Sequence, residues 1–145
     1  MSPSLHEMII LTNTIRFNQN LDDFVTNPQN RYRSFTEKEQ AIPSEILERI
    51  AKKEFKDEPL LKSETILLKT LFERKIKGLL TGRETLPYGN PTISFLGEKI
   101  NLDISPIRGN PQDNFIRILY TAYQICEECL QENKPVYLSI TKDNV

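Results

Sequence analysis

The sequence predicts a helix-rich α+β fold, and three observations carry this prediction. Two long segments, 63–80 and 110–134, repeat apolar residues every three or four positions, which is the period of an amphipathic helix. Between them, residues 92–104 alternate apolar and polar side chains, which is the period of a strand. The chain has 145 residues, a usual length for one domain, so we expect residues 1–145 to share one core.

Composition and charge narrow the class of protein. Hydrophobic residues make up 38% of the chain and the formal net charge is −1, so nothing in the overall charge favours a nucleic acid or an anionic membrane. No apolar run approaches the roughly 18 residues that a membrane span needs. The run Met8–Leu11 is short and follows His6 and Glu7, unlike the basic start of a secretory signal. We therefore expect a cytoplasmic protein with no membrane partner.

Residues 1–42 are the least clearly patterned part of the chain. A short helix starting after Ser4 would align the apolar residues up to Ile15. We favour it over a strand at Glu7–Thr12, which the β-branched content supports. The segment Gln29–Ala41 is predicted to be an exposed connection. Its Arg31-Tyr32-Arg33 alternation suits either stacking on nucleic acid or a solvated loop with one anchoring aromatic, and we favour the loop.

Two helices are predicted in the middle of the chain. The first covers 43–55 and starts at Pro43 and Ser44. The second covers 63–80, with Ser63 as its N-cap or an earlier start at Glu58, and it ends before Gly82. The apolar positions expected to face the core in this second helix are Leu60, Leu67, Leu68, Leu71, Phe72, Ile76, Leu79 and Leu80.

Residues 92–104 read as a β-hairpin around the turn Leu96-Gly97-Glu98. Its alternation places Ser94, Asn101 and Asp103 in solvent. Because an isolated hairpin is only marginally stable, it needs a further strand or a helix, and Val136–Thr141 is predicted as the third strand of the same small antiparallel sheet.

The segment 110–134 is the longest predicted helix. Asn110 is a suitable N-cap, Pro111 suits the first helical position, and Asp113 lies where the helix dipole favours a negative charge. Its wide apolar face is either the centre of the domain core or the seam of a homodimer, and we favour the core. The residues of this face are Phe115, Ile118, Leu119, Ala122, Ile125, Cys126, Cys129 and Leu130.

Candidate chemistry is sparse. Cys126 and Cys129 fall on the apolar face of a helix, and with His6 as the one histidine they do not supply the four ligands of a zinc site. The residues Glu98, Lys99 and Asp103 are a poor constellation for a metal-dependent nuclease because two of them lie at a turn. No nucleophile elbow, phosphate loop or dinucleotide-binding motif is present. We predict no enzyme activity, catalytic residue, metal or cofactor.

A nucleic-acid-binding function is the alternative hypothesis. The order helix 43–55, helix 63–80 and hairpin 92–104 resembles the winged-helix arrangement of DNA-binding domains, a resemblance of element order rather than of sequence motif. That resemblance implies that helix 63–80 reads the DNA. One acid, Glu73, lies among the five cations that would carry the binding. These cations are Lys69, Arg74, Lys75, Lys77 and Arg83.

The sequence thus favours a small regulatory or adaptor protein that acts by binding another protein, or a second copy of itself through helix 110–134. The support is the long amphipathic helices together with the near-neutral charge.

Overall fold

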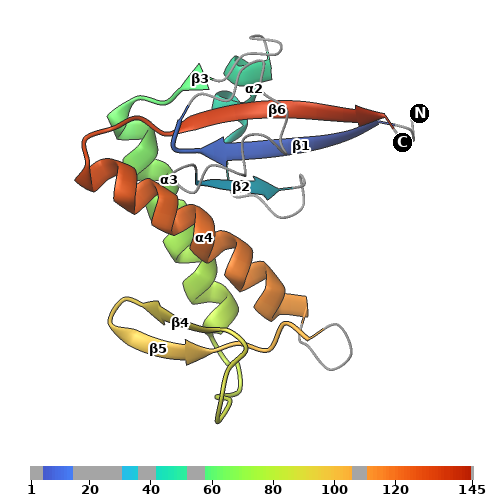
Figure 1. Cartoon of the computed structure of the whole chain (residues 1–145), viewed down its shortest axis with the longest axis vertical. Helices are drawn as coiled ribbons and strands as arrows, with labels where there is room; N and C mark the ends of the chain where they lie inside the picture. The colour runs from blue at the N-terminus through green and yellow to red at the C-terminus, as the bar shows by residue number, and fades with distance from the viewer. Residues whose placement is uncertain (1–4, 15–30, 36–41, 52–57, 106–110, 145) are drawn as a thin grey trace.

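The structure, a computed structural model, describes residues 5–14, 31–35, 42–51, 58–105 and 111–144 (Figure 1). These segments form three helices and six strands, which confirms the predicted helix-rich α+β class. In chain order the elements are β1 (Leu5–Thr12), β2 (Tyr32–Phe35), α2 (Ser44–Ala51), β3 (Glu58–Pro59), α3 (Lys62–Leu80), β4 (Thr92–Phe95), β5 (Glu98–Asn101), α4 (Pro111–Gln131) and β6 (Tyr137–Asn144).

The helices α3 and α4 lie side by side and connect two separate sheets (Figure 1). At one end of the helix pair is a four-stranded antiparallel sheet with the strand order β2-β1-β6-β3. At the other end is the hairpin β4-β5. One hydrophobic cluster runs through all of these parts, from Ile9 in the sheet through α3 and α4 to Phe95 in the hairpin.

The prediction that the C-terminal strand joins the hairpin is wrong. The strand β6 pairs with β1 along all of its length, from Leu5 opposite Asn144 to Thr12 opposite Tyr137. The physical reason is the length of α4, which has 21 residues and therefore spans about 31 Å. The hairpin precedes the first residue of α4 and β6 follows its last, so the two lie at opposite ends of the helix.

The favoured helix near the N-terminus is also wrong, and the alternative strand is correct. Ile9, Ile10 and Leu11 are all buried, and neighbouring residues of a strand point to opposite faces of the sheet. The apolar run therefore belongs to a strand that is buried on both faces. The predicted exposed connection over Gln29–Ala41 contains β2, whose Phe35 is buried and stacks on Phe72 of α3 at 5.9 Å between ring centroids.

The long C-terminal helix is confirmed, with bounds of Pro111–Gln131, and residues 106–110 lie outside the described structure. Its apolar face packs against α3 and the sheet. The side chains of Leu119, Ala122, Ile125 and Cys126 have no exposed surface, so this face is core, and it is not free to serve as the seam of a homodimer.

The two middle helices are confirmed with shifted ends. The described part of α2 ends at Ala51, and residues 52–57 lie outside the described structure. The predicted cap Ser63 is wrong, because the N-cap position is Leu61, two residues earlier, and the carboxylate of Glu64 accepts a hydrogen bond of 2.9 Å from the N–H of Leu61. Gly82 follows the helix end with φ +74°, a conformation that glycine adopts without strain, as predicted. None of the described helices combines the length and apolarity needed to cross a bilayer.

Candidate functional site

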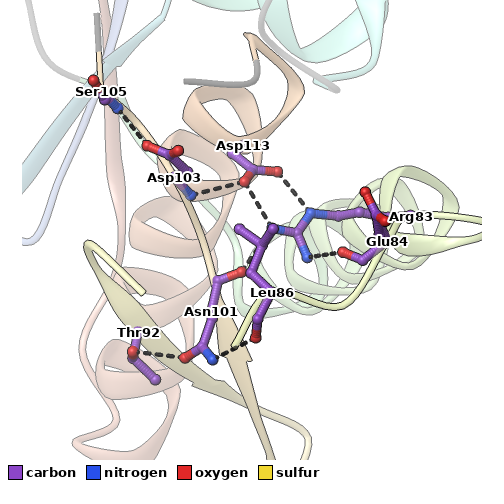
Figure 2. Close-up of polar contacts among 8 residues, drawn as sticks. All are labelled: Arg83, Glu84, Leu86, Thr92, Asn101, Asp103, Ser105 and Asp113. Carbon is purple, nitrogen blue, oxygen red and sulfur yellow. Dashed lines mark hydrogen bonds and ion pairs between the residues drawn. The ribbon is translucent and has the colours of Figure 1, made fainter. Parts of the chain in front are cut away.

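The five predicted nucleic-acid-binding cations do not form one surface. Arg83 is the clearest departure, because only 8% of its side chain is exposed. Its guanidinium points into the junction between α3, the hairpin and the start of α4, where it meets the carboxylate of Asp113, of which 1% is exposed (Figure 2). Arg83 is therefore not available to a phosphate backbone while this junction is closed.

The junction is a fully connected polar network (Figure 2). Arg83 Nε donates to Asp113 Oδ1 and Arg83 Nη2 donates to Asp113 Oδ2, each at 2.7 Å. Arg83 Nη2 also donates to the carbonyl of Asn101 at 2.6 Å, and the N–H of Asp103 donates to Asp113 Oδ2 at 2.8 Å. The carboxamide of Asn101 donates to the Leu86 carbonyl and accepts from the Thr92 hydroxyl. The network thus joins three elements that are distant in sequence.

The electrostatics of the pair favour its charged form. Burial alone would raise the pKa of Asp113, but the hydrogen bonds from Arg83 and from the Asp103 backbone, together with the positive charge of Arg83, lower it below its ordinary value. The hydrogen bond to Asp113 raises the pKa of Arg83, against the effect of burial. Because both groups are charged and bonded to each other, the pair is suited to holding the junction closed rather than to proton transfer.

This network also corrects the predicted hairpin. Asn101 and Asp103, expected in solvent, are partly buried in the junction, whereas Ser94 is exposed as predicted. The ladder ends at Asn101, and Asp103 forms an isolated bridge with Asn90. The nuclease candidate Asp103 uses its carboxylate to accept the N–H of Ser105 at 3.0 Å. Within the described residues, no three His, Cys, Asp or Glu side chains gather as a metal site would require.

Two more of the cations lie against aromatic rings of α4. The ammonium of Lys69 is 5.6 Å from the centroid of the Tyr123 ring and 3.6 Å from the Glu127 carboxylate. Lys75 lies over the Phe115 ring at 5.9 Å. Burial, followed by the charge of Glu127 and the hydrogen bond that Tyr123 donates to it, raises the pKa of Tyr123 to about 12. Lys69 and Lys75 therefore help to hold α3 on α4.

The remaining cations, Arg74 and Lys77, point away from α4. Lys77 is 57% exposed and pairs weakly with Glu73 one turn earlier, at 3.7 Å. No ion pair or hydrogen bond of the Arg74 side chain is found among the described residues. Helical spacing places Arg74 and Lys77 on the same side of α3 as Ile66 and Leu67. We call this side the α3 outer face, defined by Ile66, Leu67, Thr70, Arg74, Lys77 and Gly78.

The outer face is apolar in its first half. Ile66 is 48% exposed and Leu67 44% exposed, and Leu61, just before the helix, is 63% exposed. The Thr70 hydroxyl donates to the Ile66 carbonyl at 3.0 Å, so its hydrogen-bonding capacity is largely used within the helix and its methyl group adds to the apolar surface. The prediction that Leu67 faces the core is wrong, because the core side of α3 is already occupied by Leu68, Phe72 and Ile76.

The second half of the outer face contains Gly78, for which the described parts of the chain show no packing role. Gly78 lies within α3, where glycine costs about 1 kcal/mol relative to alanine. Its φ is not in the left-handed region, and a Cβ added there would meet no atom within 4 Å. Neither backbone geometry nor internal packing therefore explains a glycine at this position.

The two cysteines are buried and free, as predicted. Burial raises the pKa of Cys126 to about 12 and also raises the pKa of Cys129. A cavity of about 170 Å³ lies between the start of α3 and the end of α4. It is lined by Leu60, Lys62, Thr65, Cys129, Leu130, Asn133, Lys134 and Pro135. A thiol with a raised pKa is a weak nucleophile, so the cavity carries no evident chemistry.

The element order of a winged helix is present, but its packing is not. A helix–turn–helix unit joins its two helices by a turn of a few residues. Here β3 lies between α2 and α3, α2 packs on β6, and the main partner of α3 is α4. The contact between α2 and α3 includes the ion pair of Arg49 with Glu64 at 2.9 Å.

Sequence reasoning missed the outer face of α3 and the partner of Arg83. One signal for the first was available, since Leu67 precedes Ile76 by nine positions, a spacing that places the two side chains on opposite sides of a helix. For the second there was none, because Arg83 and Asp113 are far apart in sequence. A scan against protein-family models and searches of curated proteins and of solved structures find no match to this chain.

Proposed function

We propose that this protein is a regulatory or adaptor protein that binds another protein through the α3 outer face. The observation that carries the proposal is the exposure of Ile66 and Leu67 on a helix whose opposite face is buried in the core through Thr65, Leu68, Phe72 and Ile76. These side chains are not needed to close the core, and water contact makes them unfavourable in the isolated chain. A partner that covers them gains the free energy of burying apolar surface.

Three of the four large aliphatic side chains that are exposed among the described residues lie near the start of α3. Leu61 directly precedes the helix, Ile66 and Leu67 lie in its first two turns, and Thr70 adds its methyl group, whereas the fourth, Leu96, lies at the hairpin turn. Single exposed apolar residues are normal on any protein, whereas grouped ones more often mark an interaction site. Because both cysteines are free thiols, we place this binding in the reducing environment of the cytoplasm.

Nucleic-acid binding is the alternative. It is supported by the exposed cations Arg74 and Lys77, but Arg83 is buried and Lys69 faces α4. Two or three cations beside exposed leucine and isoleucine suit a protein surface better than a phosphate backbone. The alternative predicts binding to duplex or single-stranded DNA that weakens steeply between about 50 and 200 mM salt.

Site-specific photo-crosslinking tests the proposal. A benzophenone amino acid replaces Leu67 in one variant and Leu96 in the other, since both leucines are about half exposed but Leu96 lies at the tip of the hairpin. We expect a discrete crosslinked protein product from position 67 and none from position 96 in living cells. Equal products from both positions, or no product from position 67, would overturn the assignment of the binding surface.

A further inference from the structure

We infer that the partner segment which docks on the α3 outer face is an acidic amphipathic helix of another protein. This inference rests on the proposed function and adds the chemical class of the partner. It is argued from three independent properties of the face: the spacing of its residues, its charge, and its glycine.

The spacing of the outer face suits a helix. Leu67, Leu71, Arg74 and Gly78 follow each other at steps of four, three and four residues, so they form one row along α3, with Leu71 half-buried at its inner edge. Rows of this kind interdigitate with the rows of a second helix, at an interaxial distance of about 8–10 Å. An apolar helix face with anchors at the same spacing is the matching surface.

The positive charge of the outer face favours a partner that carries carboxylates. Arg74 has no ion-pair partner in the described parts of the chain, and Lys77 shares only the weak contact with Glu73. A carboxylate placed opposite Arg74 can accept two parallel hydrogen bonds from its guanidinium. The apolar half of the face then takes leucine-like anchors and the cationic half takes acidic residues, so the partner helix is both amphipathic and acidic.

Gly78 gives the third argument. A helix position that carries no side chain lets a second backbone approach closely, as small residues do at tight helix crossings. Among the residues that the structure describes, none has an atom within 4 Å of a Cβ added at Gly78, so the space above it is open. The position therefore has a function only when a partner occupies that space, and an alanine there favours the isolated helix while it obstructs the complex.

A second copy of this chain is a poorer occupant. The outer face has one carboxylate near its cations, Glu73, and it already pairs with Lys77. Two outer faces packed together place Arg74 of one copy against either the cations or the leucine of the other. Neither arrangement neutralises its charge, whereas an acidic helix does.

The test uses defined peptides with the full-length protein. The probe is a fluorescent helical peptide of about 18 residues, or five turns, with leucine at every third or fourth position and glutamate elsewhere. Its counterpart has lysine in place of glutamate, and a duplex DNA oligonucleotide serves as a polyanion without apolar anchors. We expect fluorescence anisotropy to show the acidic peptide binding at least about tenfold more tightly than the lysine peptide.

Three variants test the residues of the face, with Leu96→Asp as the matched control. Leu67→Asp and Arg74→Glu should each weaken acidic-peptide binding by about tenfold or more, while Leu96→Asp leaves it unchanged. Gly78→Ala should weaken binding while it raises the melting temperature. Weaker binding together with a higher melting temperature would show that Gly78 contributes to the contact with the peptide and not to folding.

The experiments distinguish a failure of the inferred partner class from a failure of the proposed function. If neither peptide binds, or if Arg74→Glu binds the acidic peptide as well as the wild type does, the inferred partner class is wrong. A product from position 67 in the crosslinking experiment would then still support the proposed function. If the DNA binds instead and the same variants abolish that binding, the acidic helix is overturned in favour of a nucleic acid.

Discussion

The guanidinium of Arg83 and the carboxylate of Asp113 meet through two hydrogen bonds of 2.7 Å at the point where α3, the hairpin and α4 converge (Figure 2). Both side chains are almost completely buried. The pair fixes the hairpin to the helices on one end of the molecule, while the opposite end is held by the four-stranded sheet. The helix α3 is therefore anchored at both ends, and its outer face is presented on a rigid support.

Removing one partner of this pair should be strongly destabilising. Asp113→Asn leaves the Arg83 charge buried without its counter-ion, and we expect the free energy of unfolding at pH 7 to fall by about 3–5 kcal/mol. Glu132→Gln is the control, because Glu132 forms an ion pair with Lys134 in which both side chains are more than half exposed. The control should lose less than about 1 kcal/mol in the same urea titration. Equal losses of unfolding free energy in the two variants would show that the Arg83–Asp113 pair does not hold α3, the hairpin and α4 together.

The Asp113 contribution should depend on pH in a defined direction. The folded protein lowers the pKa of Asp113 below its ordinary value of 3.8, so the contribution is fully present above that value and is lost as the pH falls through the folded pKa. The difference in unfolding free energy between the wild type and Asp113→Asn should therefore narrow as the pH falls below about 4. A constant difference over this range, measured by urea unfolding, would contradict the charged pair.

The neighbours Leu67 and Leu68 provide a matched test of which side of α3 is buried. Leu68 is completely buried and Leu67 is 44% exposed. Leu68→Ala should lower the free energy of unfolding by about 2–5 kcal/mol, since it removes buried methyl groups and leaves a cavity. Leu67→Ala should stay within about 0.5 kcal/mol of the wild type. Reversed magnitudes in chemical denaturation would mean that α3 is rotated about its axis.

The two glycines around the end of α3 should respond to alanine with opposite signs. Gly78→Ala should stabilise the isolated protein by about 1 kcal/mol, because alanine is the better helix former and its Cβ meets nothing. Gly82→Ala should destabilise it, since Gly82 has φ +74°, which strains any residue with a Cβ. Thermal unfolding of both variants checks this, and a destabilised Gly78→Ala would show that the space above Gly78 is filled within the chain.

The thiols should be unreactive until the protein unfolds. Burial raises the pKa of Cys126 to about 12 and raises that of Cys129, so the thiolate form is disfavoured in the folded state. The thiols ionise more readily when unfolded, so their contribution to stability is present below about pH 9 and is lost as the pH rises above it. A disulfide reagent at pH 8 should modify both thiols at the rate of unfolding. Rapid modification of the native protein would contradict their burial.

The sequence predicted those elements whose signal is local. The helices α3 and α4 and the hairpin were found because their apolar residues repeat at one clear period over many positions. The apolar residues between Ser4 and Ile15 are too few to distinguish the helical period from the strand period. Pairing with β2 and with β6, which lies at the other end of the chain, decides for a strand.

The candidate site depends in part on tertiary packing that no local pattern reveals. The spacing within α3 already places Leu68 with Phe72 and Ile76 and places Leu67 with Arg74, but only the packing shows that Leu67 is left exposed. The predicted nucleic-acid-binding cations look equivalent in sequence, but the packing gives them different surroundings. Arg83 is paired with Asp113, and Lys69 lies against Tyr123 and Glu127. Arg74 is exposed.

The central claim is that a partner protein docks on the α3 outer face and approaches its backbone closely at Gly78, and crosslinking from position 67 in a Gly78→Ala background tests this claim most directly. The account predicts a rise in melting temperature together with a several-fold drop in the crosslinked product, compared with the same crosslinker in the Gly78 protein. A crosslink yield that stays the same or rises with stability would contradict it, because Gly78 would then have no part in admitting a partner.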